Sequence, residues 1–296
     1  TLEEIYEAFS TGQQDIAAIR NFIRYLYYNQ GKQLKYLCLF GDTSYDYKNH
    51  TGTSDMVVPT FHSVNSFSLA NSYMSDDFFT MMDTSEGLLG SLDKMDIAVG
   101  RMLFTNAKEA ADSVNKVIEY ENPENIGDWI NTYTILSDDA DYTSSKDDYN
   151  IQVRLDELGA KLISEKPILN INKIHADYFQ QVSSSGGDRY PEAQKKLINS
   201  MISGSLVVNY FGHGGEDGLA SELLVDKNMV STLFHPGKYP LFNIITCEFT
   251  RFDNHERKTA GELLYQNPVG GAIGLITTTR QIIVPKGITY NKIISK

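Results

Sequence analysis

The sequence has no long apolar run and no basic cluster, and each absence counts against one class of protein. No stretch of its 296 residues approaches the roughly 18 consecutive apolar residues of a membrane-spanning helix. Lys and Arg total 26 against 38 Asp and Glu, which gives a formal net charge of −12. Nucleic-acid binding requires clustered Lys and Arg to meet the phosphates, so we expect no nucleic-acid partner.

Cysteine is scarce, and the start of the chain lacks the marks of a leader. Cys38 and Cys247 lie far apart in sequence, and two cysteines permit one disulfide without indicating a disulfide framework. The first residues, TLEEIYEAFS, have neither the basic and apolar regions of a signal peptide nor an initiator methionine. We therefore expect the chain to be an excised piece of a longer protein.

Predicted strands and helices alternate along the chain. Apolar residues at helical spacing predict a helix over 15–30, and the apolar run 35–40 predicts a buried strand. Further strands are predicted at 75–82, 95–101, 132–139, 171–177, 205–212, 240–247 and 271–279, and further helices at 105–120, 147–162, 191–202, 226–233 and 259–265. This alternation predicts an α/β fold with mainly parallel sheets flanked by helices.

A linker-like stretch divides the chain. The segment ENPENIGDW, residues 121–129, combines proline, glycine and polar residues between two periodic regions. We place the domain boundary there, with one part over 1–125 and the other over 126–296.

Two of the predicted strands end in reactive side chains. The stretch NYFGHGGEDG places His213 directly after one strand, and PLFNIITC places Cys247 at the end of another. Functional groups collect at the carboxyl ends of strands in a parallel sheet. The separation (247 − 213 = 34 residues) accommodates one helix and one strand, so the second strand is expected near the first. We expect the two side chains to meet at one sheet edge.

A thiol beside an imidazole has well-defined chemistry. An ordinary thiol has a pKa of about 8.5 and an imidazole one of about 6.5, so the imidazole can remove the thiol proton or stabilise the thiolate. Gly214 and Gly215 carry no Cβ, so a substrate backbone can approach closely, and the N–H groups of Gly214 and Cys247 are candidate oxyanion donors. Cys38 lies inside its strand and is assigned to the core.

Other interpretations stay open at this point. Cys247 could be a small buried hydrophobe and His213 a structural turn residue. The glycines of GHGGEDG do not fit a dinucleotide loop, and no G-x-S-x-G elbow accompanies the HGG. A metal site could be formed by four side chains: His175, Asp177, His213 and Glu216. Their spacing matches no recognised metal-binding motif, which counts against this interpretation. No metal site is predicted.

Longer strings in the sequence resemble a known family. NYFGHGG followed by TCEFTRFDN is similar to the gingipain-type cysteine peptidases, which have a caspase-like fold. YLCLFGDTSYDYKN, QQVSSSGGDRYPEA, RFDNHERKTAGELL and NPVGGAIGLITTTR resemble the PorU-type sortases of the type IX secretion system. The resemblance covers nearly the whole chain and implies a caspase/gingipain-like fold. It also implies two subdomains, over 1–125 and 126–296, with the first strand of the former missing before residue 1.

The resemblance implies roles for particular residues. Cys247 corresponds to the nucleophile and His213 to the general base. Asp139 lies where gingipains place an acid that orients the histidine, and Asp138 and Asp141 compete for that role.

One departure from the gingipains concerns specificity. The charged Glu248 follows the nucleophile where gingipains have a small residue. The gingipain preference for basic residues is therefore not carried over, and Glu248 is a candidate substrate-binding residue.

The resemblance also implies a biological role. Such a sortase is exported to the cell surface, is attached peripherally at the outer membrane beside secretion components, and removes the C-terminal sorting domain from secreted cargo proteins. It passes the acyl group to an amine on lipopolysaccharide. No cofactor is required, although gingipain relatives bind calcium and the sequence has candidate acidic clusters at Asp76–Asp77, Asp138–Asp139 and Asp147–Asp148. The alternative is a non-catalytic caspase-like binding module that recognises cargo.

Overall fold

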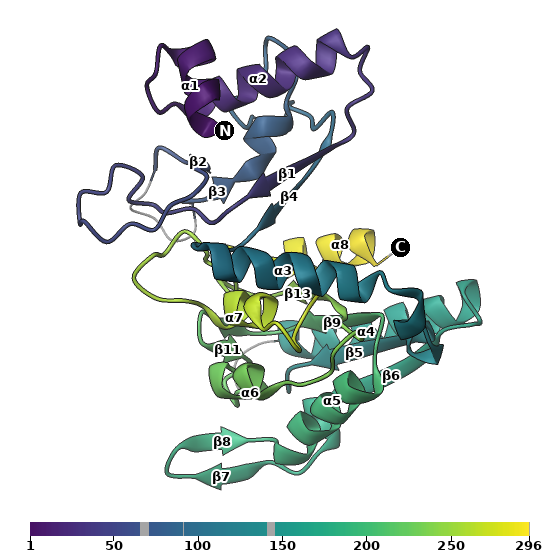
Figure 1. Ribbon diagram of the computed structural model, residues 1–296. Helices are drawn as coiled ribbons and strands as arrows, with labels where there is room; N and C mark the ends of the chain where they lie inside the picture. The colour runs from purple at the N-terminus through teal and green to yellow at the C-terminus, as the bar shows by residue number, and fades with distance from the viewer. Residues whose placement is uncertain (66–70, 91, 141–145, 296) are drawn as a thin grey trace. The chain divides into compact units, whose positions relative to one another are not determined.

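The computed structural model describes residues 1–65, 71–90, 92–140 and 146–295, with the backbone alone for 146–150. Its contacts divide the chain into two compact units (Figure 1). Unit 1 comprises Thr1–Ala110 and Phe252–Glu256, and unit 2 comprises Ala111–Arg251 and Arg257–Lys296. The second segment of unit 1 is an insertion into unit 2 that the sequence did not predict.

Unit 1 is built from two helices, two small sheets and a short 3-10 helix. Its elements are α1 (Leu2–Ser10), α2 (Ile16–Asn29), β1 (Tyr36–Phe40), β2 (Phe61–His62), β3 (Met74–Ser75), η1 (Asp76–Thr80) and β4 (Ala98–Met102). Strands β1 and β4 pair in parallel, and β2 pairs with β3 antiparallel. The core combines side chains from the helices, the strands and η1: Ile19, Ile23, Tyr27, Leu39, Val58, Phe78, Phe79, Met82 and Ile97.

The predicted strand over 75–82 is wrong beyond its first residue. The Ser75 hydroxyl accepts a hydrogen bond from the Asp77 N–H at 3.2 Å and caps η1. This local side-chain bond favours a helical turn over a strand ladder. The apolar residues that suggested a strand are buried in the unit 1 core from the 3-10 helix.

Arg101 on β4 fixes the loops around it. Its guanidinium forms a two-pronged ion pair with Asp76, with Nε–Oδ2 and Nη2–Oδ1 distances of 2.9 and 2.6 Å. It also donates to the main-chain carbonyls of Gly41, Val58 and Pro59. A planar guanidinium suits this role because its donors are held in a rigid fork.

The segment Phe252–Glu256 is bound into unit 1 by polar contacts. His255 Nδ1 lies 2.8 Å from the Ser44 hydroxyl, and His62 Nε2 lies 3.3 Å from the Asp253 carboxylate. The Tyr45 N–H donates to the Asp253 carbonyl at 2.9 Å. A stretch that begins five positions after Cys247 (252 − 247 = 5) is therefore part of unit 1.

The assignment of Cys38 to the core is wrong. On β1 the side chains alternate, and Leu39 points into the core while Cys38 is exposed. A strand covered on one face only alternates in this way, whereas the apolar run suggested a strand buried on both faces. Neighbouring groups still partly desolvate the Cys38 thiol, and this raises its pKa. The positive charge of Arg101 lowers the pKa and so opposes this rise.

Unit 2 contains a five-stranded parallel sheet. The order is β14 (Gly274–Thr277), β13 (Leu241–Ile245), β9 (Val207–Phe211), β5 (Thr132–Ser137) and β6 (Asn170–His175), with every neighbouring pair parallel. This confirms the predicted α/β class and the strands that sequence placed at these positions.

Helices cover both faces of this sheet. One core packs α5 (Pro191–Ser203), α6 (Lys227–Thr232) and α7 (Ala260–Gln266) on the face that carries Val208 and Tyr210. The other packs α4 (Lys146–Glu165) and α8 (Val284–Ile294) on the face that carries Phe211 and Ile245. Successive residues of β9 thus face opposite layers, as the pleat requires.

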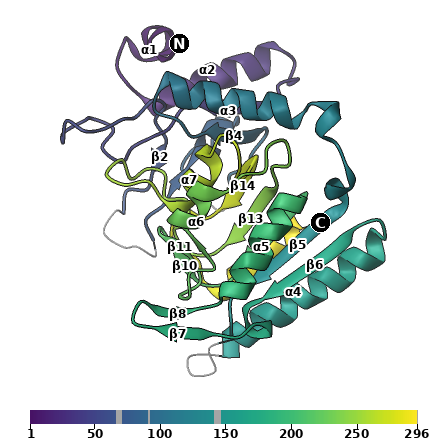
Figure 2. The same cartoon turned by 60° about the horizontal axis from the view of Figure 1, so that its bottom comes forward.

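Several elements of unit 2 were not predicted. They are the helix α8, the hairpin β7 (Val182–Ser184) with β8 (Gly187–Arg189), the small sheet of β10 (Gly214–Gly215), β11 (Gly218–Leu219) and β12 (Val225–Asp226), and the 3-10 helices η2 (Pro123–Asn125), η3 (Asp128–Asn131) and η4 (Ala176–Tyr178). The β7–β8 hairpin projects from unit 2 in Figures 1 and 2. Its strands are short, polar and exposed, so they gave no apolar alternation to read.

The division between the units differs from the boundary predicted near residue 125. It falls within α3 (Ala107–Tyr120), because most of this helix contacts unit 2. Lys116 on α3 is buried and donates to the carbonyls of Tyr265 and Asn267 at 3.0 and 2.8 Å. The linker 121–129 lies beyond the division and forms η2 and part of η3.

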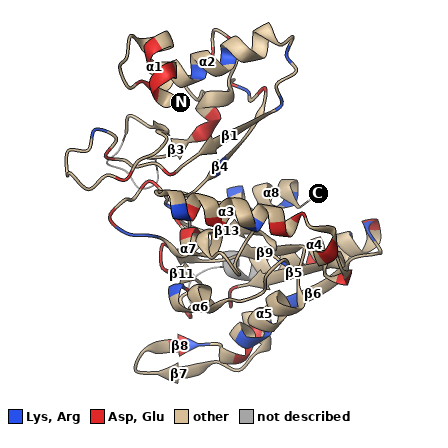
Figure 3. Ribbon diagram, viewed as in Figure 1, with Lys and Arg blue, Asp and Glu red and all other residues tan. Residues whose placement is uncertain are grey.

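Charges of both signs occur in each unit. In unit 1, α1 carries only acidic residues and α2 only arginines, whereas α3 and α5 of unit 2 carry both signs (Figure 3). Among the described residues, no helix combines the length and the apolar character needed to cross a bilayer.

Burial of Lys116 predicts a pH-dependent stability. Burial lowers its pKa from 10.5 to about 7. Between pH 7 and 10.5 the unfolded chain holds a proton that the native state has released, so the free energy of unfolding should rise with pH across this window, by an amount on the order of a few kcal/mol. Urea unfolding from pH 7 to 10 should show the rise in the native protein and a flatter profile in Lys116→Met.

The matched control is Lys108→Met, on the exposed side of the same helix. This variant should keep the native slope. A Lys116→Met profile that parallels the native one would show that the rise comes from other groups.

Candidate functional site

His213 and Cys247 follow two neighbouring strands that share one register. Strands β9 and β13 pair in parallel with a constant offset of 34 residues, from Leu241 opposite Val207 to Ile245 opposite Phe211. His213 lies two residues after Phe211 and Cys247 two residues after Ile245, so the same offset relates them (247 − 213 = 34). Neighbouring strands lie about 4.8 Å apart, so the strand ends that the two residues follow lie side by side.

The same row continues onto a third strand. Strand β5 pairs with β9 at an offset of 74, as in Ser137 opposite Phe211 (211 − 137 = 74). Extending that offset by two residues sets Asp139 opposite His213 (213 − 74 = 139). The positions two residues past the paired ends of β5, β9 and β13 therefore hold a carboxylate, an imidazole and a thiol.

Glycines let the chain turn sharply after β9. A Cβ on Gly212 would lie 2.5 Å from the Tyr210 hydroxyl and 2.7 Å from the Asp138 Cβ. One on Gly214 would lie 2.8 Å from the Thr246 hydroxyl and 2.9 Å from the Gly218 carbonyl. Side chains at either position would force the neighbouring segments apart.

The N–H of Gly214 makes no hydrogen bond within the small sheet of β10, β11 and β12. The Ala220 N–H donates to the His213 carbonyl at 2.9 Å, so His213 and Ala220 form the hydrogen-bonded pair that precedes Gly214 and Leu219 in the antiparallel ladder. Hydrogen-bonded and non-hydrogen-bonded pairs alternate in such a ladder. The Gly214 N–H consequently points away from β11.

The backbone is strained immediately after Cys247. Glu248 has φ of 52°, in the left-handed region, which costs a non-glycine residue about 1 kcal/mol. Its N–H donates to the Arg280 carbonyl at 3.3 Å, which fixes this conformation. Cys247 is half-buried, and its Sγ lies 3.8 Å from the Ile282 carbonyl.

Asp138 holds the main chain of His213. Its Oδ2 accepts the His213 N–H at 2.9 Å, and its Oδ1 accepts the Asp139 N–H at 3.1 Å. The side chain is buried, while His213 is exposed. Asp138 was considered only as an alternative to Asp139 for the acid that orients His213; the bond seen here is to the main chain.

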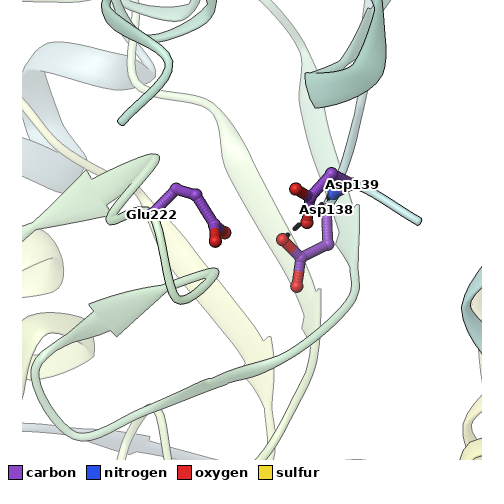
Figure 4. A group of neighbouring side chains, drawn as sticks. All are labelled: Asp138, Asp139 and Glu222. Carbon is purple, nitrogen blue, oxygen red and sulfur yellow. Dashed lines mark hydrogen bonds between the residues drawn. The ribbon is translucent and has the colours of Figure 1, made fainter. Parts of the chain in front are cut away.

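Three carboxylates gather beside this bond. Ligand atoms of Asp138, Asp139 and Glu222 all lie within 4.8 Å of one another, and Figure 4 shows Glu222 reaching toward the two aspartates from a separate segment. Burial raises the pKa of Asp138 to about 7; the His213 N–H opposes this rise, and the charges of Asp139 and Glu222 add to it. Carboxylates this close favour holding a proton between them.

The same three oxygen donors are of the type that a calcium ion binds, although calcium takes six to eight oxygens. The structure does not support a calcium site at the two other acidic clusters predicted from the sequence. Asp76 forms an ion pair with Arg101, and the side chains of residues 147–148 lie outside the described part of the chain.

Asp139 is linked to the β7–β8 hairpin. Its Oδ2 accepts the Tyr190 hydroxyl at 2.8 Å, directly after β8. Burial and this bond raise the pKa of Tyr190, so its hydroxyl stays protonated and continues to donate. Asp141, the remaining alternative for the orienting acid, lies outside the described residues.

Glu248 belongs to a group of ion pairs. Its Oε1 lies 3.9 Å from Arg251 Nη1, which also lies 3.1 Å from Glu216 Oε1. Arg257 pairs with Glu216 at 3.4 Å and with Asp217. The acidic residues after His213 are thus matched by arginines that follow Cys247.

The residues weighed for a metal site do not come together as one. His175 is buried, with Nδ1 at 2.6 Å from the Ser137 hydroxyl, and Asp177 accepts the Ala140 N–H and the Gln152 side chain. Glu216 is paired with arginines, as described above. The carboxylate group that the described residues do form contains Glu222, which sequence reasoning missed because no motif marks it.

Comparison with known proteins gives the family. The model of peptidase family C25 matches residues 1–296. The chain belongs to this family. Membership in C25 supports a cysteine peptidase activity. No curated protein matches the sequence.

Solved structures of C25 peptidases show the same fold. The Arg-specific cysteine proteinase gingipain R superposes with a TM-score of 0.68 at 17% identity, over 98% of this chain and 59% of that one. A complex of the pro- and mature domains of RgpB from Porphyromonas gingivalis gives 0.67 at 17% identity, over 98% of this chain and 61% of that one. The chain thus has a gingipain-like fold and spans less than two thirds of these structures.

The raised pKa of Asp138 predicts a second pH effect on this C25 chain. The pKa rises from 3.8 unfolded to about 7 folded. Between pH 4 and 7 the native state keeps a proton that the unfolded chain has lost, so this group makes the free energy of unfolding fall as pH rises. Urea unfolding at pH 4.5 to 7 should show a smaller fall in Asp138→Asn than in the native protein. The exposed Asp188→Asn should keep the native slope, and an unchanged slope in Asp138→Asn would contradict the assignment.

Proposed function

We propose that this chain is the catalytic part of a cysteine endopeptidase and transpeptidase. It removes the C-terminal sorting domain of type IX secreted cargo and transfers the acyl group to a lipopolysaccharide amine. Cys247 acts as nucleophile and His213 as general base. The observation that supports this proposal is the shared register of β9 and β13, because His213 and Cys247 each follow two residues after the last paired position.

The reaction follows from these positions. His213 takes the proton of the Cys247 thiol, and the thiolate attacks the peptide carbonyl of the cargo. The Gly214 N–H, which points away from β11, and the Cys247 N–H donate to the oxyanion. The imidazolium returns its proton to the leaving amine, which departs with the sorting domain. An incoming amine then attacks the thioester, loses its proton to His213, and forms the new amide while the thiol is restored.

Three acidic residues have supporting roles in the proposal. Asp139 orients His213 from the adjacent strand, as the row across β5, β9 and β13 favours. Glu248 contributes to substrate binding next to the nucleophile, with its charge balanced in part by Arg251. Calcium, if supplied, would be held by Asp138, Asp139 and Glu222, and no step of the reaction passes through it.

The setting of the reaction is part of the proposal. The long strings shared with the PorU-type sortases favour cargo with a C-terminal sorting domain over the arginine-directed cleavage named for gingipain R. We place the enzyme at the extracellular face of the outer membrane, with secretion components as its partners. A non-catalytic module that binds cargo with the same fold is the second candidate.

The dyad can be tested by thiol alkylation. Iodoacetamide at neutral pH should label Cys247 faster than Cys38, because an adjacent imidazole promotes the thiolate while Cys38 is exposed but has a raised pKa. In His213→Ala the rate at Cys247 should fall roughly tenfold or more, and Cys38 should be unaffected. Mass spectrometry of the two cysteine peptides measures both rates in one sample. Equal rates at Cys247 in both proteins would favour the binding module.

The transfer step needs a separate experiment, on the full-length protein with cargo and an amine acceptor. We expect more conjugate than free acid, because a bound amine competes with water at a high effective concentration. Cys247→Ala should leave the cargo uncut, and mass spectrometry of the cargo C-terminus distinguishes the products. Free acid alone, across a range of acceptor concentrations, would leave a plain cysteine endopeptidase.

A further inference from the structure

The main chain of His213 is held from both sides by buried side chains. Its N–H donates to Asp138 Oδ2 at 2.9 Å. Its carbonyl accepts the Tyr210 hydroxyl at 2.5 Å and the Ala220 N–H at 2.9 Å. Tyr210 is 0% exposed and Asp138 is 5% exposed, whereas His213 itself is exposed. An exposed residue in a glycine turn is thus anchored to the interior of unit 2.

The two anchoring side chains act on opposite ends of the same residue. The Tyr210 hydroxyl donates to the His213 carbonyl, and the Asp138 carboxyl group accepts the His213 N–H. The two bonds together fix the peptide groups on both sides of the His213 Cα.

Two further carboxylates lie beside Asp138. Asp139 follows β5 together with Asp138, and Glu222 lies in the segment between β11 and β12.

The side chains of Tyr210 and Asp138 pack tightly against Gly212. Gly212 lies between Tyr210 and His213 in sequence, and a Cβ there would come within 2.5 Å of the Tyr210 hydroxyl and 2.7 Å of the Asp138 Cβ. Both side chains therefore contact the main chain at Gly212, immediately before His213. Fixing the N–H and the carbonyl of one residue leaves its side chain only rotation about χ1 and χ2.

We propose that Tyr210 and Asp138 are positioning residues for His213, which they aim along the row toward Cys247 by holding its main chain from both sides. The proposal rests on the proposed function, in which His213 activates Cys247. It assigns to Asp138 and Tyr210 a role on the backbone of the histidine, separate from any acid that bonds its ring.

The test compares two buried tyrosines. Tyr210→Phe removes the hydroxyl that reaches His213 and keeps the ring. Tyr239→Phe is the matched control, because Tyr239 is equally buried and its hydroxyl donates to Glu119 at 2.6 Å, away from the His213 turn. Each variant loses the hydrogen bonding of one buried hydroxyl, so both should lose similar stability, about 1–2 kcal/mol.

The readout is the rate of iodoacetamide alkylation at Cys247, followed from pH 5 to 9 in the folded protein. Tyr210→Phe should lower the rate at neutral pH roughly tenfold to a hundredfold and move the rise of the rate to higher pH. Tyr239→Phe should leave both unchanged. Asp138→Ala removes both acceptor oxygens of the second anchor and should act in the same direction, so it decides the question if circular dichroism shows Tyr210→Phe unfolded.

The outcomes separate this inference from the proposed function. If His213→Ala slows alkylation while Tyr210→Phe and Asp138→Ala match the native rate, the positioning role is overturned and the dyad stands. An equal effect of Tyr210→Phe and Tyr239→Phe would reduce Tyr210 to a stabilising residue. If His213→Ala itself leaves the rate unchanged, the proposed function fails first.

Discussion

The parallel register of β5, β9 and β13 is the constraint on which the site depends. Because these strands pair without a bulge, residues that follow them at equal distances leave the sheet at one level. The offset of 34 residues between β9 and β13 equals the separation of His213 and Cys247, and the offset of 74 between β5 and β9 equals that of Asp139 and His213. A slip of one residue in either pairing would turn every side chain of that strand to the opposite face. The packing of α5 to α7 and of α4 with α8 on the two faces of the sheet therefore also secures the site.

The residues after β5 and β13 include two features that lower the stability of the fold. Asp138 is buried beside two other carboxylates, and Glu248 adopts a left-handed backbone. Both features persist because neighbouring groups hold them in place: main-chain N–H groups on Asp138, and the Arg280 carbonyl on Glu248. Local conflicts of this kind concentrate at functional sites, where geometry matters more than stability.

The sequence predicted the sheet of unit 2 better than the details of the site. Strands such as 205–212 and 240–247 are apolar runs between turn signals, and such patterns are local. Glu222 joins Asp138 only because the chain folds back between β11 and β12, where Ala220 and Leu223 take positive φ values. The exposure of Cys38 depends on which face of β1 is covered, and η1 depends on one serine cap. These features arise from contacts that no spacing in the sequence encodes.

The short insertion at Phe252–Glu256 has a consequence for the order of folding. Unit 1 takes most of its residues from the first 110 positions, yet its contacts with His255 and Asp253 come from a segment more than twice as far along the chain. During synthesis from the N-terminus, unit 1 cannot complete these contacts until β9 and β13 of unit 2 have been made. The last contacts of unit 1 therefore come from the stretch that begins five residues after Cys247. Unit 1 of a newly made chain is complete only after most of unit 2 has been synthesised.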